Sequence, residues 1–163
     1  MMINIGCYCV DIENGSDFAE FSITFDDPLS AYESFATRTE YIGGRISITI
    51  IDRKLEFVTS FDLDYLRAFT NGLTELYNNL RGSVRLVDWE YMMAVDFKVL
   101  DRGQGLIAIT GEFGEYRISP EPDEEKDRFQ FAIATTVKGL RTDQSYLPEV
   151  IRQLNDLLRM YNV

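Results

Sequence analysis

A repeat of apolar residues at every second position is the feature of this sequence that most constrains its fold. In the segment FAEFSITF, residues 18–25, one side of an extended chain is apolar and the other is polar. Successive side chains of a strand point to opposite faces, so this pattern is typical of a strand with one buried face. The apolar positions of this segment and of four later ones are Ala19, Phe21, Ile23 and Phe25; Ile46, Ile48 and Ile50; Met93, Val95, Phe97 and Val99; Ile107, Ile109 and Phe113; and Phe129, Phe131 and Ile133.

Two other segments repeat their apolar residues at helical spacing. We expect a helix over 62–81, with Asp62 as its N-cap and Gly82 in the left-handed conformation that often follows a helix. A second helix is expected over 145–161. Each helix has an apolar stripe that must be buried against other elements.

This order of elements predicts one domain, 1–163, with an α+β fold: a mostly antiparallel sheet with two amphipathic helices packed on one face. We expect acidic strands and a loop over 1–40, then a sheet over 83–136 that carries an acidic loop at 119–128. The hydrophobic content of 45% is sufficient to build a core.

The net charge of −11 is concentrated in two places. Residues 1–40 hold eight acidic residues against one arginine, and residues 121–127 hold five against one lysine. Such a field repels nucleic acids and anionic membranes, whereas it attracts a basic protein. A solvated acidic loop that serves solubility is the alternative. The acidic residues that we consider for partner binding are Asp26, Asp27, Glu121, Asp123, Glu124 and Glu125.

Trp89 and Glu90 are two further candidates for partner binding. They are the last two residues of a segment, 83–90, whose alternation is imperfect, and a bulge or a strand end near Asp88 would explain this. We expect Trp89 to be a buried anchor of the core or of a strand edge, because tryptophans are usually well buried. A binding surface is the alternative.

The residues available for chemistry are few. The chain has no histidine, and its two cysteines, Cys7 and Cys9, are expected to be free thiols in a reducing compartment. Carboxylate pairs such as Asp88 and Glu90 are the residue type that a hydrolase without histidine would use, but they lie in no recognisable motif. We therefore expect no catalytic residues, no metal site and no cofactor.

The location of the protein is predicted from the membrane-spanning and secretory features of the sequence. No apolar run approaches the roughly 18 residues that a membrane-spanning helix needs, and the amino terminus lacks the basic flank of a secretory signal. We expect a cytoplasmic protein. The oligomeric state is left open.

The order of segments 61–113, 129–136 and 142–158 resembles the immunity proteins that are paired with bacterial wall-associated polymorphic toxins, the WapI-like immunity family. The shared features, between Gly44 and Leu158, are a helix followed by a glycine, a Trp-Glu at a strand junction, a glycine turn, and Asp-Gln-Ser before the last helix. This resemblance implies a small cytosolic α+β protein that binds and neutralises a toxin domain without catalysis. A stand-alone ligand-binding or structural domain is the alternative.

Overall fold

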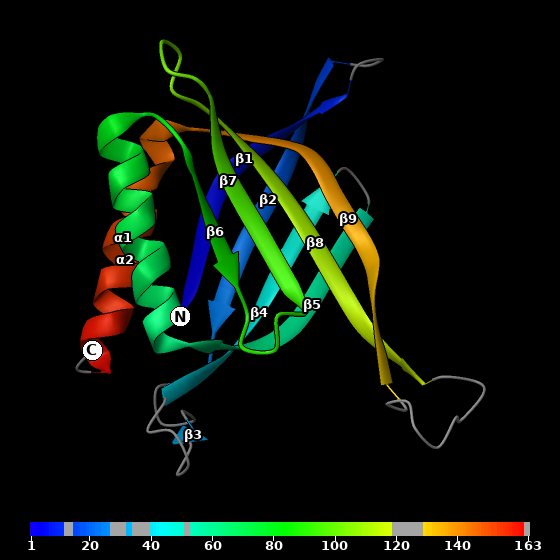
Figure 1. Cartoon of the computed structure of the whole chain (residues 1–163). Coiled ribbons are helices and arrows are strands. Elements are labelled where there is room, and N and C mark those ends of the chain that lie inside the picture. Colours follow the sequence, from blue (N-terminus) through cyan, green and yellow to red (C-terminus); the bar gives the residue numbers. More distant parts are fainter. Residues whose placement is uncertain (12–14, 27–31, 34–39, 51–52, 119–128, 162–163) are drawn as a thin grey trace.

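The computed structural model describes residues 1–11, 15–26, 32–33, 40–50, 53–118 and 129–161. Figure 1 shows the elements in chain order. They are β1 (Met2–Asp11), β2 (Gly15–Phe25), β3 (Tyr32–Glu33), β4 (Glu40–Ile50), β5 (Arg53–Asp62), α1 (Leu63–Asn79), β6 (Ser83–Val87), β7 (Met93–Asp101), β8 (Leu106–Ile118), β9 (Phe129–Asp143), a 3-10 turn (Gln144–Tyr146) and α2 (Leu147–Met160).

The described strands form one sheet, in the order β5-β4-β2-β1-β9-β8-β7-β6, and the short β3 pairs with the start of β4. Every pairing in it is antiparallel. Both helices lie on one side of this sheet (Figure 1), which confirms the expected α+β fold class.

The two ends of the sheet approach each other. The backbone N–H of Trp89, just after β6, donates to the carbonyl oxygen of Ser60 in β5 at 2.9 Å. The ring centroid of Phe57 in β5 lies 5.5 Å from that of Phe113 in β8. Because β5 and β6 stand at opposite ends of the strand order, these contacts require a strongly curled sheet.

The core lies between the inner face of the curled sheet and the two helices. Phe97 of β7 is fully buried, with its ring centroid 5.6 Å from that of Phe69 in α1 and 6.1 Å from that of Phe21 in β2. The apolar stripe of α2 is buried as well, for example at Leu154 and Leu157. The alternating residues of β2, β7 and β8 point into this core, as their period predicts.

The ends of α1 follow the expected signals. The side chain of Asp62 accepts hydrogen bonds from the backbone N–H groups of Asp64 and Tyr65 at 2.8 and 3.1 Å, so it is the N-cap. At the other end Gly82 has a φ of 84°, but Leu80 already adopts the left-handed conformation, with a φ of 46°. The helix therefore ends at Asn79, three residues before the glycine.

The sheet is longer than the sequence predicted. Strand β9 continues to Asp143 instead of ending near 136. At Lys138 and Gly139, two residues of β9 oppose one residue of β8. Gly139 has a φ of 84°, as in a β-bulge, and the bulge interrupts the alternation by which a strand is recognised. The side chains of Phe129, Phe131 and Ile133, expected to point inward, lie outside the described part of the chain.

Candidate partner-binding surface

The turn from Asp88 to Met92 joins β6 to β7 and is held by a buried carboxylate. Asp88 is 1% exposed. One of its oxygens accepts the backbone N–H of Met93 at 2.9 Å, and the other accepts the hydroxyl of Thr59 in β5 at 2.7 Å. These bonds fix the turn both to its own hairpin and to the far end of the sheet. The imperfect alternation near Asp88 thus marks the end of a strand.

Four aromatic side chains lie around this turn, and we call them the aromatic surface: Tyr41, Tyr65, Trp89 and Tyr91. The ring of Trp89 lies at 70° to that of Tyr41, with the centroids 4.3 Å apart. The hydroxyl groups of Tyr65 and Tyr91 are hydrogen-bonded to each other, and this bond raises the pKa of Tyr65. The rings are therefore held in fixed positions although two of them are exposed to solvent.

The exposure of Trp89 differs from the sequence expectation. Trp89 is 40% exposed, so the expectation that it is a buried anchor is wrong. Its backbone is fixed through Ser60 and its ring contacts that of Tyr41, while part of the residue remains open to solvent. The isolated sequence pattern did not show that the turn would carry the ring away from the core.

Tyr91 is the most unusual residue of the turn. It is 61% exposed and has a φ of 56°, in the left-handed region. That conformation costs a residue with a Cβ about 1–2 kcal/mol, whereas glycine adopts it freely. A large aromatic side chain at such a position indicates that the ring has a role of its own on the aromatic surface.

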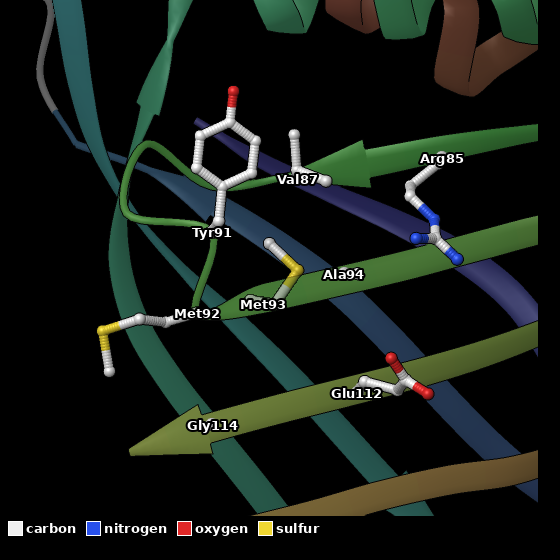
Figure 2. A pocket seen from close by; sticks show the side chains of 8 residues that line it. All are labelled: Arg85, Val87, Tyr91, Met92, Met93, Ala94, Glu112 and Gly114. Carbon is white, nitrogen blue, oxygen red and sulfur yellow. The ribbon is translucent and has the colours of Figure 1, made fainter. Parts of the chain in front are cut away.

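Two hollows flank the turn, and both are lined by Met92 and Gly114. The first, of about 190 Å³, is drawn in Figure 2 and is bordered by Val87, Tyr91 and Glu112. The second, which we call the edge hollow, has a volume of about 480 Å³. It is lined by Phe57, Val58, Thr59, Ser60, Asp88, Glu90, Met92 and Gly114.

The charges of the two hollows differ. Arg85 in the first hollow donates two hydrogen bonds to Asp96, at 2.8 and 2.7 Å, and this contact raises the pKa of the guanidinium. Figure 2 shows Arg85 and Glu112 pointing toward one another across β7. The edge hollow, in contrast, is lined by the carboxylates of Asp88 and Glu90, and no lysine or arginine is among its described lining residues.

The other candidate residues from the sequence are only partly placed. Asp26, at the end of β2, is exposed and lines a polar groove with Arg45 and Glu56 on the opposite face from the core. Strands β4 and β5 lie between Asp26 and Trp89, so the structure does not bring these two residues together. The remaining five acidic candidates lie outside the described residues: Asp27, Glu121, Asp123, Glu124 and Glu125.

Sequence reasoning missed Tyr41, Tyr65 and Tyr91. Tyr91 could have been noticed, because it follows Trp89 and Glu90 in a segment that does not fit a strand. Tyr41 and Tyr65 could not, since only the curl of the sheet brings them to the turn. Asp88 had been considered as half of a catalytic carboxylate pair, but both of its oxygens are occupied by structural hydrogen bonds.

The two cysteines are the other reactive groups of the chain. Cys7 and Cys9 are free thiols, and burial raises the pKa of Cys7 to about 11, with a smaller contribution from Cys9. The Cys7 thiol is thus protonated at neutral pH and a poor nucleophile. Among the described residues there is no cluster of three or more cysteine, aspartate or glutamate side chains arranged for a metal ion. Within the same ranges, no helix has the length and apolar character needed to span a membrane.

Comparison with known proteins identifies a family. The model of the immunity protein WapI-like family matches residues 11–162. This match extends the resemblance seen in the sequence, from Gly44 to Leu158, into the acidic amino-terminal segment. Neither the curated proteins nor the solved structures contain a significant match.

Proposed function

Because this chain belongs to the WapI-like immunity protein family, we propose that it binds a toxin domain in the cytoplasm and blocks the activity of that domain without catalysis. The observation that carries the choice of surface is the exposed aromatic turn, fixed in place by the buried Asp88. Family membership supplies the kind of partner, and the turn supplies the contact.

The composition of the aromatic surface supports this role. Tryptophan and tyrosine are enriched among the residues that contribute most to protein–protein binding, and they give a large contact area for little loss of side-chain freedom. Trp89 and Tyr91 are already oriented by Tyr41 and Tyr65, so little order remains to be imposed when a partner binds. Glu90, exposed between them, adds a negative charge to the same surface.

The charge of the chain supports a basic partner. With a net charge of −11, it attracts a positively charged protein and speeds the encounter, especially at low salt. We propose that Asp26, Asp27, Glu121, Asp123, Glu124 and Glu125 contribute to this attraction. Trp89 and Glu90 then form the contact that holds the complex together.

The test requires the toxin domain, which we expect to be encoded in the gene next to that of this protein. The domain should be produced with and without this chain in the same cells, and growth should be compared. We expect growth to be restored by this chain, and the two purified proteins to form a complex in calorimetry. If the toxin domain remains fully toxic and no complex forms, the proposal is wrong for that partner.

A further inference from the structure

The outer edge of β5 is open over most of its length. In the described part of the chain β5 pairs only with β4, and the turn after β6 reaches it only at its end, where Trp89 donates to Ser60. Thr59, next to Ser60, is held by Asp88. The edge is thus closed at Ser60 and open before it.

The bond to Ser60 also shows which residues of β5 face outward. In an antiparallel pair, the backbone groups of alternate residues point toward the neighbouring strand and away from it. Since the carbonyl of Ser60 points away from β4, the N–H and C=O groups of Val58 and Glu56 do so as well. Gly43 of β4 is the partner of Ser60. Its carbonyl accepts the N–H of Asp26 on the side away from β5, which agrees with this alternation.

The edge hollow lies beside this open backbone. Its walls include the apolar side chains of Phe57, Val58 and Met92, and Val58 is 69% exposed. The carboxylate of Glu90 forms its acidic end and makes no hydrogen bond or ion pair with any described residue. Apolar walls with an acidic end suit the side chain of lysine or arginine, whose long stem is apolar and whose head is positive.

We propose that an extended, basic segment of the toxin adds as a strand to the outer edge of β5, between Lys54 and Val58, and places a lysine or arginine in the edge hollow beside Glu90. The proposal rests on the proposed function for the identity of the partner. Backbone hydrogen bonds to Val58 and Glu56 provide affinity, and the hollow selects the side chain, as in other cases of strand addition.

A second copy of this chain fits the edge less well than a basic partner. Two copies, each with a net charge of −11, repel one another, and a copy would bring a second Glu90 toward the first or leave the hollow empty. The edge also carries the charged side chains of Lys54 and Glu56, which are paired at 3.0 Å and discourage pairing between identical edges.

The first test is a substitution that blocks strand addition but not the fold. Val58→Pro removes an N–H that faces away from β4, and proline is tolerated at such edge positions. Val58→Thr is the matched control, because it keeps the N–H and the β-branched shape. With an inactive form of the toxin domain encoded by the neighbouring gene, we expect Val58→Pro to weaken binding at least about 10-fold and Val58→Thr by less than about 3-fold.

The second test concerns the acidic end of the hollow. We expect Glu90→Gln to weaken binding by about 3- to 10-fold, while Glu75→Gln, which removes the same charge from an exposed position on α1, leaves it unchanged. Equal effects of the two substitutions would show that only net charge matters and would overturn the placement of a basic side chain in the hollow.

A third measurement does not depend on any variant folding correctly. Amide hydrogen exchange of the unaltered protein should show that the Val58 and Glu56 N–H groups become protected when the toxin domain binds. If the toxin binds but these amides stay unprotected, or if Val58→Pro binds normally, strand addition is wrong and the proposed function stands. If the toxin does not bind at all, both proposals fail. A dimer in the absence of toxin, with the same two amides protected, would assign the edge to a second copy instead.

Discussion

Two groups of aromatic rings in this protein have similar contact geometry and opposite surroundings. Phe21, Phe69 and Phe97 meet in tilted or edge-to-face contacts inside the core, and none is more than 2% exposed. Trp89 and Tyr91 make the same kinds of contact with tyrosine partners at the end of the sheet, but they are 40% and 61% exposed. The core rings stabilise the fold through burial, whereas the turn rings keep area that a partner can cover.

The largest effect that tests this comparison is expected when a core ring is truncated. Phe97→Ala should lower the free energy of unfolding by about 3–5 kcal/mol, because the cavity forms between α1, β2 and β7 where little can collapse. Phe97→Leu, which fills most of the space, should cost less than about 2 kcal/mol. Urea unfolding followed by circular dichroism measures both. A loss below about 1 kcal/mol in Phe97→Ala would contradict the packing described here.

The next largest effect is expected where the core meets the turn. Asp88→Ala leaves the N–H of Met93 and the hydroxyl of Thr59 without their acceptor, so we expect a loss of about 1–3 kcal/mol. Asp96→Ala is the control, because its ion pair with Arg85 lies on the surface and should contribute at most about 1 kcal/mol. Equal losses in the two variants would mean that Asp88 does not hold the turn.

Trp89→Ala should affect toxin binding more than stability, in contrast to Phe97→Ala. The contact with Tyr41 contributes about 0.5–1.5 kcal/mol in addition to the area that the half-exposed ring buries, so the loss of stability should be smaller than in Phe97→Ala. Binding of the toxin domain, however, should weaken by about 30-fold or more, as for a residue at the centre of an interface. Tyr77→Ala is a matched control, because Tyr77 is an aromatic residue of similar exposure on α1. If Trp89→Ala binds as well as Tyr77→Ala, the aromatic surface is not the contact.

The sequence predicted the core of this protein better than its candidate surface, and the reason is the range of the interactions. Alternation and helical spacing are local, so the burial of Phe97 and the N-cap at Asp62 followed from neighbouring residues. The β-bulge at Gly139 is also local, but it breaks the very pattern by which strand β9 was recognised.

The aromatic surface depends on contacts between residues far apart in the chain. Thr59 and Asp88 are separated by 29 residues, and the contact between Tyr41 and Trp89 spans more. No periodicity in a single sequence indicates that the ends of the sheet curl toward each other. The Trp-Glu pair could be singled out, but whether Trp89 pointed inward or outward was decided by the hydrogen bonds of Asp88 and Ser60.

The smallest effect on stability is expected from the acidic segment at 121–127, which lies outside the described residues and is considered from its charge alone. Changing Asp123 to Asn and both Glu124 and Glu125 to Gln removes three negative charges from a run of five acids and one lysine. If these charges steer a basic toxin, the association rate should fall several-fold at low salt while the dissociation rate and the unfolding temperature stay nearly constant. The difference from the unaltered protein should shrink near 0.1 M salt and above, since charges more than about 10 Å apart are then screened. Stopped-flow association at several salt concentrations measures this, and rates that match those of the unaltered protein throughout would assign the acidic segment to solubility.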